Sequence, residues 1–592
     1  MYMKFDRLAE FFDRIEATSG RNQMIAMLAG LVGETDAREV DKVVYLSQGR
    51  LLPPFMTLEF GVGEASVRGA LAAAAKVKDE TVRERFADAG DYGTVAEQLL
   101  KRHKSAGLAV TEVYQALDAI ARAGGKGAQQ KKRDLVVALL GRLGPREAKH
   151  AVRMLLGRLR LAIGDPTVME GLSTAVAGSK ADRKALERAY NLCSDLGLVA
   201  RTYLAKGTKG LARIDVEVGK PVRPALCERV KSPEELIERM GRCALEPKID
   251  GLRCQVHKKG DDVRAYSRNL EDHSEMFPEI VEAIRKQAKG HDIIVEGEAA
   301  GYDPATFEFH PFQVTITRKR KYDIDKLREE LPLKLLAFDL LYLDGEEQTK
   351  LPWRERRKRL VKLLGKPVDF SQPEAASRGP VVQPNEVREV ETPEQVDEYF
   401  SLTVERGQEG IVAKKLDSPY EAGARNYNWI KLKRAYCGEL RDTVDCVVVG
   451  YWRGKGNRAK LGIGTLLTAV YDKERDLFTT VTRLGTGFSE QNWVKLKGLL
   501  DEIRSDERPA RVDSVLQPDV WCKPQYVIEI QADEITRSPM HTAGRADGGM
   551  GYALRFPRVL GFIRQDRKPE DATTVAEVVK LYRKQPAVAA GD

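Results

Sequence analysis

The stretch "ALEPKIDGLRCQV", residues 244–256, is the most informative about the structure and function of the middle of the chain. Lys248 ends an apolar run typical of a β-strand and stands two residues before an Asp250-Gly251 turn. A lysine is usually a solvated surface charge, but one held at a strand end can be a desolvated amine that attacks an electrophile. The motif K-x-D-G alone is a weak signal, so the rest of the chain must decide whether Lys248 is a surface charge or a nucleophile.

The sequence pattern on either side of this stretch changes twice along the chain. Up to about residue 215, apolar residues recur at three- and four-residue spacing, as in "TVAEQLLKRHKSAGLAVTEVYQALDAIARA" (94–123), which predicts helices. The Gly-, Lys- and Pro-rich segment 205–224 is typical of a linker. Short alternating strands with intervening helices follow. From about residue 440 five or so strands, among them 526–536 and 553–563, suggest a small barrel such as an OB-fold. We therefore expect an all-α domain at 1–215, an α+β domain at 216–436 and a β-barrel domain at 437–592.

Composition limits the class of protein. With 592 residues the chain is too long for one core, and its 42% hydrophobic and 31% charged residues are typical of a soluble protein. No stretch approaches ~18 unbroken apolar residues, and the charged N-terminus does not resemble a secretory signal, so we expect a cytoplasmic protein with no membrane span. The seven cysteines are scattered without C-x-x-C, which argues against a disulfide framework and a four-cysteine zinc site. The net charge of +9 is compatible with a polyanionic partner but does not identify one.

Carboxylates and an aromatic follow Lys248 in the α+β region. "VEGE" brings Glu296 and Glu298, and "EGIVAKK" brings Glu409. Acidic residues on apolar strands are costly unless they are paired or bind metal. Phe338 of "AFDLLYLDG" is either plain core packing or a face on which a base stacks, and spacing alone favours the core.

Cations complete the set. Arg253 and Arg268 stand on the two arms of a hairpin predicted at 252–268, and "GARNYNWIKLKR" (423–434) adds Arg425, Lys431 and Lys433. The last two alternate along a strand and share a face, which alone is nearly as typical of a basic surface strand. Together these groups suit nucleotidyl transfer: the aromatic stacks a purine, the carboxylates hold Mg²⁺ and the cations neutralise phosphate charge. Neighbouring cations and metal are expected to lower the pKa of the attacking lysine.

The ordered series "EPKIDGLR", "SRN", "VEGE", "AFDLLYLDG", "EGIVAKK" and "WIKLKR" resembles the covalent nucleotidyltransferases, that is, DNA ligases, RNA ligases and mRNA-capping enzymes. Further segments resemble ATP-dependent DNA ligases of the archaeal and eukaryotic replicative type, namely "RLRLAIGDPTVMEGL", "VTRLGTGFS" and "SPMHTAG". The resemblance covers nearly the whole chain. It implies a helical DNA-binding domain, an adenylation domain and an OB-fold domain.

Residue roles carry over by matching motif positions. Lys248 matches the lysine that becomes adenylylated. The other matches are Glu246 for adenine, Arg253 and Arg268 for ribose and phosphates, Glu298 for ribose and metal, Phe338 for stacking, Glu409 for metal, and Arg425, Lys431 and Lys433 for ATP phosphates.

The resemblance also implies the reaction and its partners. Nicks in double-stranded DNA are sealed through a lysyl-AMP intermediate, transfer of AMP to the 5′-phosphate and attack by the 3′-hydroxyl, with ATP and Mg²⁺, in replication, repair and recombination. We expect a monomer whose DNA binding is largely sequence-independent and weakens with salt. A hinge is expected near 432–440, because the OB-fold domain must move between steps.

Two positions depart from the family pattern. Arg567 in "RQDRKPEDATT" stands where the family has lysine, so a forked guanidinium replaces a compact ammonium. If this residue orients pyrophosphate, the change predicts slower loading of AMP, unless the neighbouring Lys568 substitutes. The stretch "LKRHKSAGLAVTEVY" (100–114) contains no phenylalanine, although archaeal relatives often carry a glutamine-and-phenylalanine loop there that docks on a sliding clamp. A sliding clamp therefore stays an open partner.

Three other functions fit part of the pattern. An mRNA-capping guanylyltransferase would share the lysine, the aromatic and the OB-fold, but it has no place for the long helical region. An NAD⁺-dependent ligase would need its own N-terminal cofactor domain and a cysteine-rich zinc module, and neither is visible. A non-catalytic DNA-binding scaffold would not need the complete set of site residues.

Overall fold

The computed structural model describes residues 2–585 except for 19, 162, 304–308, 311, 319–323, 369–378, 407, 434–442, 455–460, 486, 533, 547–548, 556 and 584. The chain forms two compact units, one of residues 1–229 with 233–431 and one of 230–232 with 432–592. The predicted hinge begins where the units divide, but most of it lies outside the described residues. Among the described helices, none has the length and apolar character needed to cross a bilayer.

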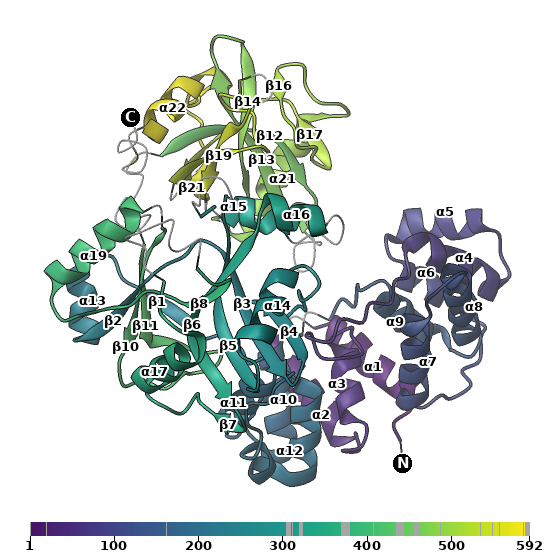
Figure 1. Cartoon of the computed structure of the whole chain (residues 1–592). Coiled ribbons are helices and arrows are strands. Elements are labelled where there is room, and N and C mark those ends of the chain that lie inside the picture. The colour runs from purple at the N-terminus through teal and green to yellow at the C-terminus, as the bar shows by residue number, and fades with distance from the viewer. Residues whose placement is uncertain are drawn as a thin grey trace. The chain divides into compact units, whose positions relative to one another are not determined.

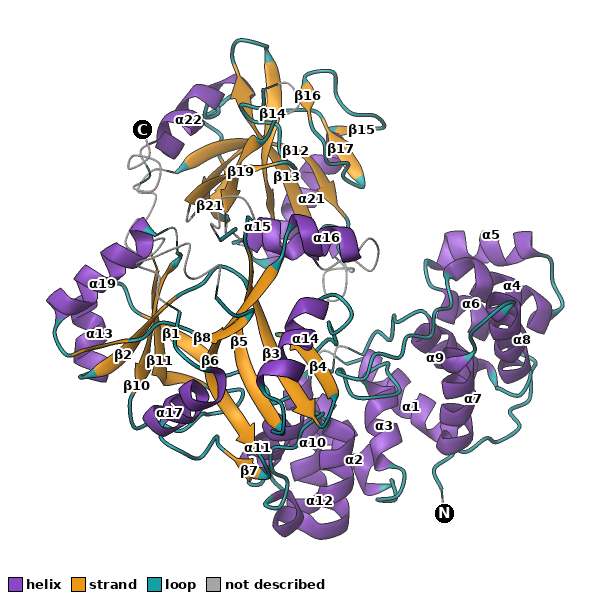
Figure 2. Cartoon of the chain, in the orientation of Figure 1, coloured by secondary structure: helices purple, strands orange, loops and turns teal. Residues whose placement is uncertain are grey.

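The first part of the chain is helical, as predicted (Figure 2). Its helices are α1 (Phe5–Glu16), α2 (Arg21–Gly33), α3 (Val40–Ser47), α4 (Glu64–Ala75), α5 (Asp79–Ala89), α6 (Tyr92–Leu99), α7 (Val110–Arg122), α8 (Ala128–Leu140), α9 (Pro145–Leu155), α10 (Asp165–Ala177), α11 (Arg183–Cys193) and α12 (Leu196–Leu211).

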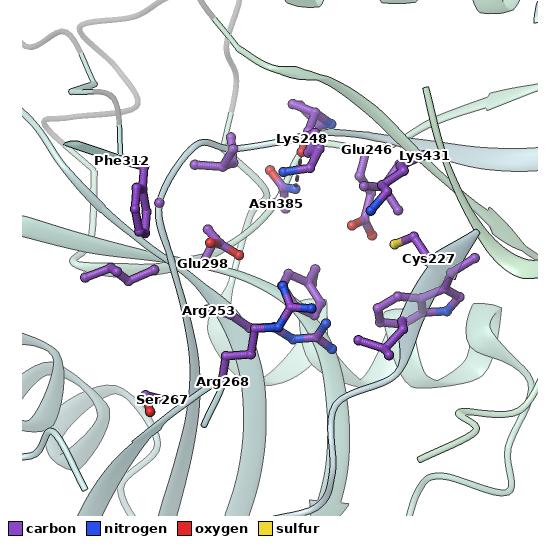
Figure 3. A pocket seen from close by; sticks show the side chains of 18 of the residues that line it. Cys227, Glu246, Lys248, Arg253, Ser267, Arg268, Glu298, Phe312, Asn385 and Lys431 are labelled. Atoms are coloured by element: carbon purple, nitrogen blue, oxygen red, sulfur yellow. Dashed lines mark hydrogen bonds between the residues drawn. The ribbon is translucent and has the colours of Figure 1, made fainter. Parts of the chain in front are cut away.

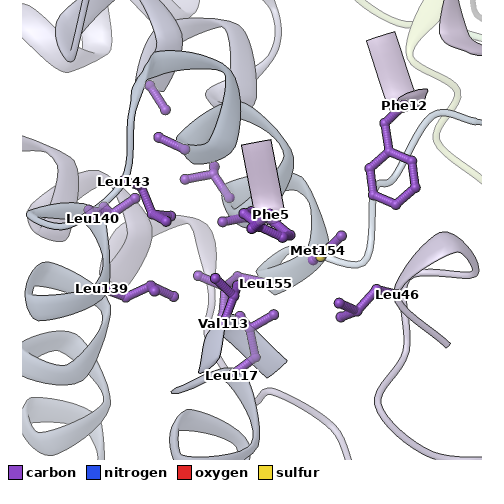
Figure 4. Close-up of a cluster of buried hydrophobic side chains, with 14 of the residues drawn as sticks. Phe5, Phe12, Leu46, Val113, Leu117, Leu139, Leu140, Leu143, Met154 and Leu155 are labelled. Atoms are coloured by element: carbon purple, nitrogen blue, oxygen red, sulfur yellow. The ribbon is translucent and has the colours of Figure 1, made fainter. Parts of the chain in front are cut away.

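Apolar stripes of α1 to α9 meet in a common core, in which Phe5, Val113 and Leu140 are fully buried (Figure 4). Capping fixes where helices begin: the Asp91 carboxylate accepts the Thr94 N–H at 3.0 Å at the start of α6. Arg153 on α9 donates to the same carboxylate at 2.7 Å, so this cap also joins two helices.

The prediction of a linker over residues 205–224 does not hold for residues 205–211, which belong to α12. Helix α12 continues to Leu211, which is buried together with Tyr203 in a second helical core. The helix is interrupted at Gly207, whose φ of 58° and ψ of −157° are not helical, and helical structure resumes beyond it, where Leu211 is buried. The non-helical connection begins after residue 212.

Two sheets form the middle of the chain (Figure 1). The larger has the order β4-β3-β5-β6-β7, with β8 beside β6, and its strands are β3 (Leu252–Lys259), β4 (Asp262–Ser267), β5 (Ile293–Gly301), β6 (Leu333–Leu343), β7 (Glu346–Glu347) and β8 (Val382–Pro384). The smaller has the order β1-β11-β10-β2-β9, and its strands are β1 (Leu226–Arg229), β2 (Cys243–Pro247), β9 (Arg388–Val390), β10 (Gly410–Lys415) and β11 (Arg425–Lys433). The predicted hairpin is confirmed as the antiparallel pair β3 and β4.

Helices cover both sheets. Helix α14 (Pro278–Gln287) packs on β4 and α17 (Trp353–Leu364) on β6, while α13 (Pro233–Met240) and α19 (Pro393–Glu405) lie beside the smaller sheet. The short α15 (Phe312–Thr315) is followed by a 3-10 turn at Ile316–Arg318 and by α16 (Ile324–Glu330). Strands β5 and β6 are almost continuously buried, as expected of strands with both faces covered.

The second unit is rich in strands, as expected of the barrel domain. Strands β12 (Val444–Trp452), β13 (Thr465–Asp472), β14 (Leu477–Leu484), β15 (Arg504–Ser505), β16 (Val512–Asp513), β17 (Val520–Cys522), β18 (Val527–Gln531) and β21 (Arg558–Ile563) form one sheet, and β19 (Glu534–Ser538) pairs with β20 (Gly551–Arg555). Helices α21 (Glu490–Glu502) and α22 (Val575–Arg583) and a 3-10 turn at Pro569–Asp571 complete it. Two segments read as single strands, 526–536 and 553–563, each contribute to two different sheets.

Candidate active site

A cavity of about 490 Å³ opens between the two sheets of the first unit (Figure 3). Strands β1, β2, β10 and β11 supply one wall, and β3, β5 and β6 supply the other. Eight of the predicted residues line it: Glu246, Lys248, Arg253, Arg268, Glu298, Phe338, Arg425 and Lys431. Glu409 reaches the site through its contact with Lys248, whereas Lys433 is not among the lining residues.

Lys248 directly follows β2 and is held by the start of β10. Its backbone N–H donates to the Gly410 carbonyl at 2.8 Å, and its own carbonyl accepts the Glu409 N–H at 3.2 Å. The Lys248 ammonium forms an ion pair with the Glu409 carboxylate. Backbone and side chain of the lysine are thus both fixed by one neighbouring segment.

The electrostatic surroundings of Lys248 differ from the prediction. Burial alone would lower the pKa of its ammonium, but the carboxylates of Glu409 and Glu298 outweigh burial and raise that pKa above its ordinary value. The cations of the chain therefore do not lower this pKa on balance, and the expected lowering by bound metal stays a prediction. The amine needs its proton removed before it can attack.

Glu298 lies within β5 and faces the cavity (Figure 3). Burial raises the pKa of its carboxyl to about 7, although Lys248 and Arg253 oppose the shift and Glu409 and Asp250 add to it. The described residues contain no group of three or more side chains that would hold a metal ion by themselves. Mg²⁺ is commonly bound by one or two carboxylates together with water and substrate phosphates, and the Glu298 and Glu409 carboxylates around Lys248 fit that role.

Arg253 is anchored behind the cavity. It crosses from β3 to β5 and pairs with the buried Glu296 at 3.0 and 2.9 Å, and its Nη1 donates to the Ala225 carbonyl at 2.7 Å. The Tyr420 hydroxyl donates to Glu296 at 2.8 Å and accepts the Ala225 N–H at 2.9 Å. This closed network orients a guanidinium that can donate to phosphate or ribose oxygens.

Phe338 contributes to the core and also faces the cavity. It packs against buried residues including Leu341, and it also lines the cavity. Trp429 meets it edge to face, with ring centroids 5.8 Å apart. An aromatic ring fixed in this way offers a flat surface to a planar base.

Glu246 on β2 is buried against Lys414 on β10. Burial raises the pKa of the Glu246 carboxyl, and Lys414 is the main group that opposes the rise. The two side chains approach to 3.0 Å. The wall formed by the smaller sheet thus carries a buried ion pair.

Family models match this chain along most of its length. The model described as DNA ligase N terminus matches residues 4–173, that of the ATP dependent DNA ligase domain matches 224–433, and that of the ATP dependent DNA ligase C terminal region matches 459–567. The chain is 48% identical over 585 residues to a probable DNA ligase of Dictyoglomus thermophilum, with 98% of each chain covered.

The chain belongs to the ATP-dependent DNA ligase family. A probable DNA ligase of Aquifex aeolicus is 41% identical, with 98% of this chain and 99% of the relative covered. The solved structure titled "Pmar-Lig_PreS3" has the same fold, with a TM-score of 0.53 at 16% identity, covering 94% of this chain and 99% of that one. The predicted fold class is thereby confirmed.

Membership establishes the overall reaction. Ligases of this family use ATP and Mg²⁺, pass through a covalent AMP intermediate and seal nicks in DNA, which serves replication and repair. The predicted ligase function is confirmed, and the role of each site residue in this chain stays a prediction.

Several lining residues of this ligase were missed by sequence reasoning. They are Cys227, Phe312, Asn385, Val412, Lys414 and Trp429. Two of them support the segment around the lysine: the Phe312 N–H donates to Asp250 at 2.9 Å, and the Asn385 amide donates to the Pro247 carbonyl at 3.3 Å. Lys414 and Trp429 stand in quoted motifs, at positions whose side chains point toward the cavity because side chains alternate along a strand. This alternation is the sequence signal that could have identified them.

Arg567, which departs from the family pattern, lies in the second unit of the ligase. Its Nε is 3.7 Å from the Asp445 carboxylate, and Arg564 approaches the same carboxyl group at 3.5 Å. The expected slower loading of AMP stays a prediction.

Proposed function

We propose that Lys248 is the nucleophile of this ligase and that the cavity around it binds ATP. In the first step Lys248 Nζ bonds to the α-phosphorus, the bond to pyrophosphate breaks, and AMP remains on nitrogen. AMP then passes to the 5′-phosphate at a nick, and the 3′-hydroxyl displaces it. Three phosphoryl transfers thus replace one difficult condensation.

The ion pair of Lys248 with Glu409 is the single observation that carries this assignment. It holds the amine at the cavity wall beside the nearest group able to accept its proton. Proton loss from Lys248 must accompany attack, because an ammonium has no lone pair. Glu298 and Glu409 would hold Mg²⁺, which would neutralise phosphate charge as pyrophosphate leaves.

The other lining residues would bind and orient the nucleotide. Phe338 would stack on adenine and Glu246 would contact its edge, while Arg253 and Arg268 would contact ribose and phosphates. Arg425, Lys431 and, from the end of the same strand, Lys433 would hold the phosphate chain.

Domain roles and partners belong to the same proposal. We assign DNA binding to 1–215, adenylation to 216–436 and the OB-fold to 437–592. We propose a monomer that acts on nicked chromosomal DNA in the cytoplasm, and a sliding clamp stays an open partner.

Labelling with α-³²P-ATP and α-³²P-GTP tests the proposal. Wild type, Lys248→Ala and Lys259→Ala, which changes an exposed lysine at the end of β3, would be incubated with Mg²⁺ and run on a denaturing gel. We expect an acid-labile label from ATP in wild type and Lys259→Ala, none in Lys248→Ala, and transfer of the label to nicked DNA. Label in Lys248→Ala would refute the assignment, and label from GTP alone would favour capping chemistry.

A further inference from the structure

The connecting segment 222–226 holds one of the arginines of the nucleotide cavity. The Ala225 carbonyl accepts a hydrogen bond from Nη1 of Arg253 at 2.7 Å, and the Ala225 N–H donates to the Tyr420 hydroxyl at 2.9 Å. The next residue, Leu226, begins β1 and lines the cavity. The position of this short segment therefore helps to set where the Arg253 guanidinium lies.

Arg223 joins this segment to the helical region, α1 to α12. Its guanidinium donates to the Asp165 carboxylate at 2.8 Å and to the Tyr190 hydroxyl, and it lies 4.3 Å from the centroid of the Tyr190 ring. Its backbone N–H donates to the Asn191 carbonyl at 2.8 Å. Asp165 is the first residue of α10, and Tyr190 and Asn191 belong to α11. Two helices thus hold one residue of the connection.

The carbonyl of Arg223 is held from the other side. It accepts the Gly423 N–H at 3.0 Å, from the loop that also carries Tyr420. Gly423 has a φ of 70°, and a Cβ atom there would lie 2.6 Å from the Asn191 side chain. The left-handed backbone and the close approach both require glycine. Helix α11 and this loop therefore enclose the connection without room for another side chain.

This arrangement is more than a connection between two regions requires. A flexible linker joins domains without any charge-assisted hydrogen bond to a distant helix. Arg223 is not among the residues that line the cavity, so it does not contact a nucleotide bound there. A fixed connection does suit preorganisation, because a guanidinium that is already held in place loses less conformational entropy when its ligand binds.

We propose that Arg223 is a positioning residue, through which the helical region holds Arg253 in the orientation that binds ATP. The Asp165 carboxylate fixes Arg223, the backbone carries this constraint to the Ala225 carbonyl, and that carbonyl holds Arg253. The coupling needs no direct contact, since no described residue before 226 lines the cavity. This inference rests on the proposed nucleotide site and deepens it.

The affinity for ATP tests the coupling. We would measure Kd for ATP on protein free of bound AMP and without Mg²⁺, which separates binding from attack by Lys248. Arg223→Met and Asp165→Asn should each raise this Kd about fivefold, at the lower end of coupling between distant sites. Arg223→Lys keeps the charge but not the fork, and it should recover part of the loss. The rate of AMP loading at saturating ATP should stay within about twofold of wild type, because only binding is affected.

Arg188→Met is the matched control. Arg188 also lies on α11, but its exposed pair with Asp215 at 3.5 Å does not involve the segment 222–226. This variant should leave Kd for ATP unchanged. Arg223→Met combined with Asp165→Asn should weaken binding no more than the stronger single change, because both changes break the same contact.

Three results would overturn the proposal: an unchanged Kd in Arg223→Met and Asp165→Asn, an equal rise in Arg188→Met, or additive effects of the two changes. Asp165→Asn keeps the shape of the side chain, so its Kd decides the question if the melting temperature shows that Arg223→Met folds poorly. Failure of the nucleotide site itself is recognised separately, because wild type would then bind no ATP.

Discussion

Glu409 contacts Lys248 twice: its carboxylate pairs with the lysine ammonium, and its backbone N–H donates to the lysine carbonyl at 3.2 Å. The first contact sets the protonation of the amine, and the second fixes the strand end that carries it. Substitution of the side chain can therefore change the pKa of Lys248 without removing the backbone contact.

The first prediction concerns the amine itself. Glu409→Gln should lower the pKa of Lys248, because a carboxylate that favours the ammonium is lost while burial remains. At a fixed pH below that pKa, a larger fraction of Lys248 is then neutral, and its modification by an amine-reactive reagent without ATP should be faster. Peptide mass spectrometry would follow Lys248, with the exposed Lys259 as internal reference. Equal modification rates in both proteins would contradict the pairing.

The second prediction concerns pH and Mg²⁺. Since the pKa of Glu298 is raised to about 7, its carboxyl gains a proton as pH falls through 7 and then binds cations less well. The Mg²⁺ concentration for half-maximal AMP loading should rise about tenfold per pH unit below pH 7. Single-turnover labelling between pH 6 and 8.5 would measure it. Glu298→Gln should flatten this dependence, and a wild-type profile that is already flat would count against Glu298 as a metal ligand.

The third prediction concerns the anchor of Arg253. Glu296→Gln removes the negative partner of the guanidinium and weakens a buried pair at 2.9 Å. We expect the efficiency of AMP loading to fall about 10- to 100-fold, mainly through KM for ATP. Glu389→Gln is the control, because Glu389 forms an exposed pair with Arg242 at the same distance. A change in kcat with KM unaltered would show that the network acts on chemistry rather than on binding.

The fourth prediction concerns stability. Arg356 and Asp339 form a fully buried pair at 2.7 Å, directly beside Phe338 in the chain. Arg356→Met leaves Asp339 buried without its partner and should cost about 3–5 kcal/mol of unfolding free energy. Arg354→Met breaks only an exposed pair with Asp417 and should cost less than about 1 kcal/mol. Urea denaturation followed by tryptophan fluorescence compares the two, and similar midpoints would contradict the burial argument.

Motif order predicted the site better than local pattern predicted the fold. Lys248, Glu298 and Phe338 converge on one cavity as their motifs indicate. Lys414 was not singled out, because a lysine in a strand is read as exposed unless the facing carboxylate is known, and Glu246 lies 168 residues away.

Errors in the fold have physical causes of the same kind. Glycine and lysine near residue 207 favour a linker locally; the helix does break at Gly207, but helical structure resumes beyond it, where Leu211 is buried. Two successive strands separated by two residues look like one strand, because apolar alternation continues across the break although the partner sheet changes. Each error arises where contacts between distant residues outweigh local propensity.

Strands β1 and β11 are parallel neighbours, with Leu226 beside Arg425 and Arg229 beside Lys431. The first and last strands of the smaller sheet therefore adjoin. A pull on the chain entering β1, opposed by a pull on the chain leaving β11, would load their hydrogen bonds in shear, the direction in which many bonds must break together. Cys227, Arg425 and Lys431 lie on this pair and line the cavity, so mechanical tension along the chain would act directly on the shape of the nucleotide pocket.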